Sequence, residues 1–216
     1  MLKTLLVPLI RSSGRELCRF NPGELQEAAE RGWNLDRLNY KEFQAARAIA
    51  AAGHISLDEA RFLADLTRLT SKDDPIIEVG TLFGYSTLVL AMNKHKDQQL
   101  ITVDQYSWNP LGISEYAHEL ATRAVLQEAC ATQNVVMVRQ DKADFYKSYR
   151  GPAPGMFFCD ANHDYECTLE DLLWARKVGA RIICGHDYDA QHHPGVVRAV
   201  TELGGPSEVS GSIFVL

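Results

Sequence analysis

From residue 76 onward, the chain alternates short apolar runs with longer segments in which apolar residues recur every three or four positions. Short runs rich in β-branched and aromatic residues are typical of buried strands, and a 3.6-residue period is typical of amphipathic helices. The pattern predicts five strands, at 76–80, 100–104, 135–138, 156–160 and 180–185, with helices between them. Strands that alternate with helices form βαβ units and a parallel sheet. A last apolar run, SIFVL, follows two glycines so closely that we expect it to pair antiparallel.

Residues 1–75 carry a helical pattern instead. Ser56 and Glu59 open the segment SLDEARFLADLTRL with the spacing of a capping box. Upstream, apolar residues recur at helical spacing between Leu38 and Ala50. The first ten residues, MLKTLLVPLI, are apolar but too short to span a bilayer and make a poor signal peptide. We therefore predict a helical arm or lid at 1–75, packed on a core at 76–216 within a single domain.

The composition narrows the class of partner. With 46% hydrophobic and 23% charged residues, the 216-residue chain has the composition of an ordinary folded globular protein. A formal net charge of -6 without a basic block argues against a nucleic-acid partner. Five cysteines without a C-x-x-C pair fit a reducing compartment. We expect a cytoplasmic protein that acts on a small molecule, with no membrane partner, and the apolar N-terminal arm is compatible with a homodimer.

The first strand leads into a glycine turn that carries an acid. Gly80 and Gly84 form only G-x-x-x-G, without the third glycine of a dinucleotide fingerprint, and Glu78 would repel a phosphate. Asp104 ends the second strand, where a carboxylate can hold both ribose hydroxyls, and Asp160 ends the fourth. Each acid alone could be a helix cap. Together at one sheet edge they favour a positively charged nucleoside without phosphate, which describes S-adenosylmethionine.

Several stretches resemble the class I S-adenosylmethionine-dependent methyltransferases: EVGTLFGYST, ITVDQY, RQDKADF, FFCDANHDY and IICGHDY. The resemblance covers about residues 55–216. It is strongest to a bacterial branch of small-molecule O-methyltransferases that is distantly related to the catechol type. It implies a doubly wound α/β fold, with a mostly parallel seven-stranded sheet, an antiparallel C-terminal strand and N-terminal helices.

The resemblance also implies roles for individual residues. Asp104 would hold the ribose, Asp141 and Lys142 would lie beside the adenine, and Asp160 would face the amino group or a metal. The family's third motif usually opens with a glycine, where this chain has Gln140, so the adenine assignment has weaker support. The methionine part would be surrounded by Glu78, Gly80, Thr81, Gly84 and Ser86.

Methyl transfer requires an aligned and deprotonated acceptor. Asp160 and His163 form D-x-x-H just beyond the fourth strand, where His163 is a candidate general base with a pKa suited to neutral pH. The alternative is that His163 caps or packs on the next helix. With Asp160, the pair His186 and Asp187 could hold a divalent ion that lowers the pKa of the acceptor.

The nature of that ion follows from its ligands. Relatives generally present carboxylates or an amide at this position, and His186 shifts the preferred ion from magnesium toward manganese, iron or zinc. The alternative is that His186 only hydrogen-bonds Asp160 and no metal binds. We expect the nearby His192 and His193 to face solvent.

Two other functions compete with a methyltransferase. An NAD(P)-dependent oxidoreductase on a related sheet is disfavoured by the missing third glycine and by Glu78. A non-catalytic nucleoside-binding protein is disfavoured by His163 and by the pair Asp160 and Asp187. The sequence does not distinguish among a sugar hydroxyl, a phenol, a hydroxamate and a carboxylate as the acceptor.

Overall fold

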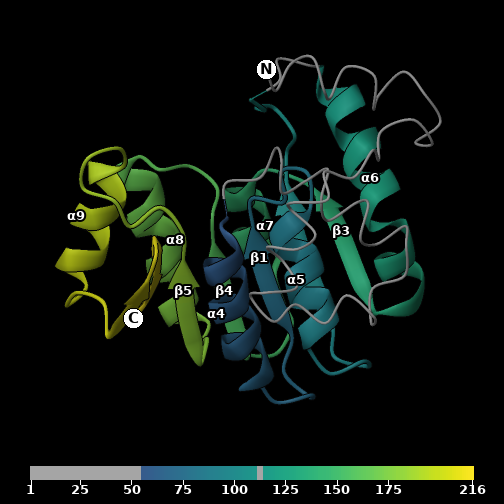
Figure 1. Cartoon of the computed structure of the whole chain (residues 1–216), viewed down its shortest axis with the longest axis horizontal. Coiled ribbons are helices and arrows are strands. Elements are labelled where there is room, and N and C mark those ends of the chain that lie inside the picture. The colour runs from purple at the N-terminus through teal and green to yellow at the C-terminus, as the bar shows by residue number, and fades with distance from the viewer. Residues whose placement is uncertain (1–54, 111–113) are drawn as a thin grey trace.

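The structure of the chain, a computed structural model, describes residues 55–110 and 114–216. Its centre is a seven-stranded sheet with the order β3-β2-β1-β4-β5-β7-β6 (Figure 1). The first five strands are parallel, and β7 runs antiparallel between β5 and β6. The strands are β1 Ile76–Val79, β2 Leu100–Asp104, β3 Val135–Arg139, β4 Met156–Cys159, β5 Ile182–Gly185, β6 Glu208–Ser210 and β7 Ile213–Val215.

Helices cover both faces of this sheet (Figure 1). They are α4 Leu57–Arg68, α5 Tyr85–Asn93, α6 Glu115–Thr132, α7 Lys142–Ser148, α8 Tyr165–Lys177 and α9 Pro194–Glu202. Buried side chains of α4, α5 and α6 form one core, and those of α7, α8 and α9 form another. Successive strand residues point to opposite faces, so Ile76 joins the first core and Ile77 the second. Both strand faces are therefore buried, as continuous apolar runs predict.

The strand order reverses around β1, which pairs with β2 on one side and β4 on the other. In open α/β sheets, ligands bind outside the carboxyl ends of the strands at such a switch point. Gly80 follows β1, Asp104 ends β2 and Asp160 follows β4. The topology thus brings the predicted glycine turn and two of the predicted acids to one edge of the sheet.

The predicted fold class is confirmed: a doubly wound, mostly parallel seven-stranded sheet with an antiparallel C-terminal strand. The capping box is also present, because the Glu59 N–H donates to Ser56 Oγ (3.2 Å) and the Ser56 N–H donates to Glu59 Oε2 (2.7 Å). The short strand β6 was not predicted. Its three residues, two of them exposed, show no apolar run.

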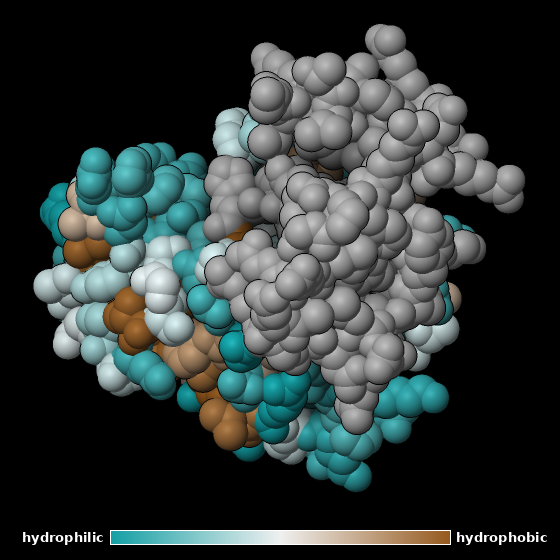
Figure 2. Space-filling view, in the orientation of Figure 1, coloured by the Kyte–Doolittle hydropathy of each residue, from teal (hydrophilic) through white to brown (hydrophobic). Residues whose placement is uncertain are grey.

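Of the predicted helical arm, only α4 lies within the described residues, and it packs against α5. The helix expected between Leu38 and Ala50 falls outside them, so the division at residues 75 and 76 stays a prediction. Among the described helices, none is both long and apolar enough to cross a bilayer. On the described part of the face in Figure 2, hydrophilic residues predominate and apolar ones form small groups.

Candidate active site

The turn after β1 requires glycine at two positions. Gly80 has φ +97°, and a Cβ atom there would lie 1.8 Å from the backbone oxygen of Asp160. The chain segments that leave β1 and β4 are therefore in direct backbone contact. Gly84 has φ +86° as the N-cap of α5, and a Cβ there would meet the Leu126 side chain at 2.9 Å. Close packing and left-handed backbone together explain both glycines.

Asp104 holds this turn in place. Its Oδ2 accepts a hydrogen bond from the Leu82 N–H (2.8 Å), and its Oδ1 accepts one from the Tyr106 N–H (2.7 Å). Leu82 has φ +48°, an uncommon conformation for a branched residue, and its carbonyl accepts from Thr122 Oγ1 (2.6 Å). Each oxygen of a carboxylate can accept more than one hydrogen bond. Asp104 therefore retains acceptor capacity at the position predicted for the ribose acid.

Glu78 lies beneath the turn, inside the protein. The alternation along β1 points it toward α5, where it is fully buried. Its carboxylate accepts hydrogen bonds from Ser86 Oγ (2.5 Å), Thr87 Oγ1 (2.5 Å) and Thr102 Oγ1 (2.6 Å). Thr81 Oγ1 in turn lies 2.5 Å from Thr102 Oγ1. Ser86 thus pairs with Glu78, and Thr81 pairs with Thr102. The contact of Glu78, Thr81 and Ser86 with the methionine part stays a prediction.

Burial raises the pKa of Glu78 to about 7, although its hydroxyl donors favour the charged form. Between about pH 4.5 and pH 7, the Glu78 carboxyl is therefore protonated in the folded protein and ionised in the unfolded chain, where its pKa is 4.5. The contribution of Glu78 to stability is full below about pH 4.5 and is lost as the pH rises toward about 7. Denaturant unfolding of the wild type and of Glu78→Gln should show a difference in unfolding free energy that falls by about 3 kcal/mol across this window. An unchanged difference would contradict this assignment.

The predicted adenine residues begin α7. Asp141 is the N-cap of this helix, and its Oδ1 accepts from the Ala143 N–H (2.9 Å). The Lys142 ammonium lies 2.6 Å from Oδ2 of the fully buried Asp171 on α8, whose Oδ1 accepts from Tyr146 Oη (2.8 Å). This ion pair ties α7 to α8. The contact of Asp141 and Lys142 with adenine stays a prediction.

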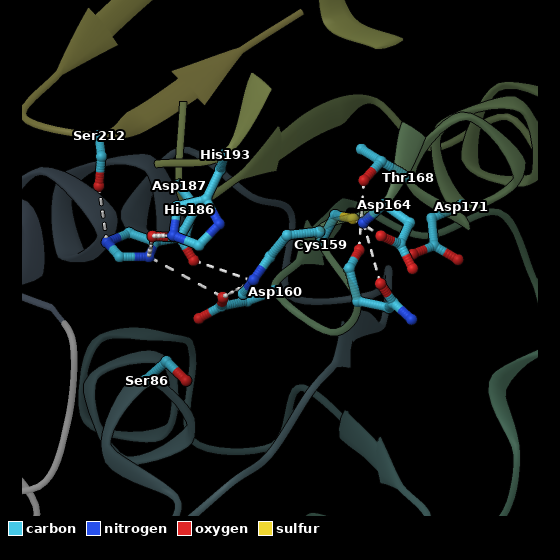
Figure 3. A network of polar contacts seen from close by, with 12 residues as sticks. Ser86, Cys159, Asp160, Asp164, Thr168, Asp171, His186, Asp187, His193 and Ser212 are labelled. Atoms are coloured by element: carbon cyan, nitrogen blue, oxygen red, sulfur yellow. Dashed lines mark hydrogen bonds and ion pairs between the residues drawn. The ribbon is translucent and has the colours of Figure 1, made fainter. Parts of the chain in front are cut away.

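The catalytic edge brings His163, Asp160 and Asp187 together. Figure 3 shows the two aspartates at this edge. His163 Nε2 lies 2.9 Å from Asp187 Oδ2 and 3.7 Å from Asp160 Oδ1. Burial alone would lower the pKa of His163, but the two carboxylates outweigh it and raise this pKa to about 9. Burial raises the pKa of Asp160 in spite of its histidine neighbours. Asp187 is partly buried, yet its histidine partners hold the pKa of this carboxyl well below its usual range.

His186 lies deeper at the same edge. Its Nδ1 is 3.2 Å from Asp187 Oδ1 and 3.9 Å from Asp160 Oδ1, and its Nε2 is 2.9 Å from Ser212 Oγ. Burial would lower the pKa of His186, but the neighbouring carboxylates of Asp187, Glu59 and Asp160 raise it to about 10. The sequence indicated Glu59 only as part of a capping box and gave no signal for Ser212.

The histidine and carboxylate atoms at this edge form two groups that could hold a cation. Among the described residues, one group is Asp160, His186 and Asp187, as predicted. The other is His163, Asp187 and His193. The expectation that His193 faces solvent was wrong: its Nε2 lies 3.6 Å from Asp187 Oδ1, and its ring centroid lies 4.5 Å from that of His163. His192 pairs instead with the exposed Asp189.

A cavity of about 380 Å³ lies beside these groups, lined in part by His163, Tyr165, His193 and Pro194. It lies between the first turns of α8 and α9. His163, His192 and His193 thus border a space large enough for a small acceptor.

The fold and the site together define the class. A parallel sheet of this order, with a glycine turn after β1 and acids after β2 and β4, is a Rossmann-like methyltransferase fold. A family described as "Methyltransferase domain" matches residues 77–188, and the chain belongs to this family. The class predicted from the sequence is confirmed. A comparison with curated protein sequences finds no match.

Solved structures agree with this assignment. A Klebsiella pneumoniae protein, provisionally described as an O-methyltransferase, is 25% identical over 86% of this chain and 84% of its own, with a TM-score of 0.62. The Streptomyces achromogenes O-methyltransferase TomG, solved with S-adenosylmethionine, is 22% identical over 86% and 83% of the two chains (TM-score 0.60). A Bacillus cereus O-methyltransferase, solved with S-adenosylhomocysteine, is 19% identical over 88% and 94% (TM-score 0.64). At these identities, the last two show the likeness of fold alone.

Proposed function

We propose that this protein transfers the methyl group of S-adenosylmethionine to a hydroxyl oxygen of a small molecule. The observation that carries the proposal is a pair of contacts at the switch point. The Asp104 carboxylate accepts a hydrogen bond from the Leu82 N–H, and Gly80 packs against the Asp160 backbone. A ribose acid, a glycine turn and a second acid are therefore parts of one rigid edge. Two structural neighbours hold S-adenosylmethionine or S-adenosylhomocysteine on the same fold, which supports this choice of cofactor.

The charge of the edge suits this cofactor. Asp104, Asp160 and Asp187 contribute carboxylates, and S-adenosylmethionine carries a sulfonium and an α-amino group without phosphate. A carboxylate attracts such a ligand and repels the pyrophosphate of NAD(P). The carboxylates of this edge and the match to the methyltransferase family at residues 77–188 both favour methyl transfer over the oxidoreductase alternative.

The reaction is an in-line displacement. The acceptor oxygen attacks the methyl carbon, the bond from that carbon to sulfur breaks, and its electron pair stays on sulfur in S-adenosylhomocysteine. The acceptor proton passes to the neutral form of His163, which stands beside the cavity and is oriented by Asp187 and Asp160. Because these carboxylates raise the pKa of His163 to about 9, the neutral form is the minor one at neutral pH, and the rate of transfer should rise as the pH approaches 9. The protein contributes alignment and exclusion of water.

The residues present also fit a divalent cation. His186 Nδ1 and His163 Nε2 are buried and make no aligned hydrogen bond, although carboxylate oxygens lie 3.2 Å and 2.9 Å away. Such unsatisfied buried atoms call for a further partner. Asp160, His186 and Asp187 would hold the ion, and two carboxylates with an imidazole suit manganese, iron or zinc. When bound, the ion would polarise the acceptor oxygen and lower its pKa.

An assay with labelled S-adenosylmethionine tests the proposal. Phenols, sugars, hydroxamates and carboxylates would be offered as acceptors, with EDTA or with added manganese. Transfer to a hydroxyl compound supports the function, and its loss with EDTA supports the metal. Cofactor binding without transfer to any acceptor would favour the non-catalytic alternative, and transfer untouched by EDTA would remove the metal.

His163 should be needed for transfer. Replacing it with glutamine removes the proton acceptor, so we expect kcat to fall by roughly a hundred- to ten-thousandfold while S-adenosylhomocysteine affinity stays the same. His95→Gln is the matched control, because His95 is exposed in the loop after α5 and does not line the cavity. Equal rates for the two variants would contradict the role of His163.

A further inference from the structure

A hydrogen-bonded network of three side chains, Glu59, Ser212 and His186, connects α4 to the catalytic edge. Glu59 on α4 accepts from the Ser212 N–H (2.6 Å) and from Ser212 Oγ (2.8 Å) through the same oxygen, Oε1. Ser212 Oγ also lies 2.9 Å from His186 Nε2. Figure 3 shows Ser212 on one side of the His186 ring, with Asp160 and Asp187 on the other. The ring therefore lies between the hydroxyl and the two acids.

The hydrogen-bond donors in this network can be assigned. A serine hydroxyl has one proton, and Glu59 Oε1, a carboxylate oxygen that only accepts, takes it. Ser212 Oγ must then accept in its contact with His186, so the Nε2 of His186 carries a proton and donates it. The other ring nitrogen, Nδ1, is left facing Asp160 and Asp187 at 3.9 Å and 3.2 Å.

Local structure fixes the position of Glu59 and of the turn that carries Ser212. The capping box engages Glu59 Oε2 with the Ser56 N–H, so Oε1 points away from the helix. Gly211 lies against this carboxylate: a Cβ on it would come within 2.5 Å of Oε1, and its φ of +62° favours glycine. The turn between β6 and β7 can therefore approach Glu59 closely. Glu59 and Ser212 both lie outside the segment that matches the methyltransferase family.

We infer that Glu59 and Ser212 are positioning residues that hold His186 with its Nε2–H on Ser212 and its Nδ1 toward Asp160 and Asp187. The inference rests on the proposed function, because it assigns these two residues to the predicted metal group. A ligating histidine commonly donates its other ring N–H to a fixed acceptor, which sets the orientation and the coordinating nitrogen. Ser212 fills that place here and is itself held by a carboxylate.

These contacts predict that removing the Ser212 hydroxyl weakens metal binding. Without the Ser212 hydroxyl, His186 Nε2 has Glu59 Oε1 at 3.5 Å as its remaining neighbour, beyond hydrogen-bond distance. The ring is then free to turn or to take the other tautomer. Loss of such supporting partners typically weakens metal binding by about ten- to a hundredfold.

The test compares Ser212→Ala with two serine controls in the full chain. Ser71→Ala removes an exposed hydroxyl that accepts from the Asp73 N–H in the turn after α4, and Ser207→Ala removes an exposed hydroxyl near the same hairpin. Manganese binding is followed by electron paramagnetic resonance, and S-adenosylhomocysteine affinity serves as the check on folding. We expect Ser212→Ala to bind manganese about ten- to a hundredfold more weakly, with the controls unchanged. Equal manganese affinity in all variants would overturn the inference.

A second measurement needs no metal. In ¹⁵N-labelled wild type, a slowly exchanging Nε2–H of His186 should be visible by NMR, assigned by its loss in His186→Gln. It should broaden in Ser212→Ala and persist in both controls. Absence of this resonance in the wild type would refute the positioning. If it is present but manganese does not bind, the metal part of the proposed function fails and the position of His186 stands.

Discussion

Replacing Asp187 with asparagine is expected to reduce methyl transfer roughly a hundred- to thousandfold, because it removes the charge shared by three histidines. Asp187 lies 2.9 Å from His163, 3.2 Å from His186 and 3.6 Å from His193. Of these three histidines His186 alone is buried, and breaking a buried ion pair by removing one partner costs about 3–5 kcal/mol of stability, since the other charge stays buried without compensation. The backbone is not the cause, because asparagine tolerates the φ of +62° that Asp187 adopts.

Asp189→Asn is the matched control for this experiment. The substitution is the same and lies two residues further along the same loop, but Asp189 pairs only with His192 at the surface among the described ion pairs. Initial rates with S-adenosylmethionine and any accepted substrate would be measured for both variants, with S-adenosylhomocysteine affinity as the check on the cofactor site. Equal rates for the two variants would show that Asp187 does not organise the catalytic edge.

Gly80→Ala is expected to destabilise the protein by more than about 3 kcal/mol. The added Cβ would lie 1.8 Å from the Asp160 backbone oxygen, so the ends of β1 and β4 would have to separate. The φ of +97° adds strain of about 1–2 kcal/mol for any residue with a Cβ. Both costs fall on the edge that carries the proposed cofactor site, so cofactor binding should be lost with stability.

Gly205→Ala separates the two costs. Gly205 also has a positive φ, +80°, but a Cβ there would meet no atom within 4 Å. Its substitution should therefore cost only the strain of about 1–2 kcal/mol. Urea unfolding of the two variants and the wild type gives the comparison. A Gly80 variant no less stable than the Gly205 variant would contradict the close contact between β1 and β4.

The sequence predicted the features that depend on pattern and on strand ends. Apolar runs placed the five parallel strands to within two residues, and the acids that close β2 and β4 reached one edge because parallel strands align their carboxyl ends. Asp160, His186 and Asp187 meet for the same reason, because β4 and β5 are neighbours. Family resemblance supplied the cofactor and the roles.

Contacts between distant side chains were not predictable in this way. Glu59 and Ser212 are 153 residues apart, and no period or motif links them. The carboxylate of Glu78 has three hydroxyl donors, two on α5 and one on the neighbouring strand β2, which only the packed structure reveals. His193 approaches Asp187 because Gly195 lets α9 pack closely on α8: a Cβ there would come within 2.6 Å of the His163 carbonyl oxygen. Each case depends on tertiary approach.

Calorimetric titration with S-adenosylhomocysteine tests the central claim most directly. The wild type should bind it at one site. Asp104→Asn keeps an acceptor for the Leu82 N–H but places an amide NH2 against the Tyr106 N–H and loses the charge that would hold the ribose. Hydrogen bonds to a charged group are worth about 1.5–3 kcal/mol, so the affinity of this variant should be roughly ten- to a hundredfold weaker. A wild type that gives no binding heat, or an asparagine variant that binds as tightly as the wild type, would contradict the account.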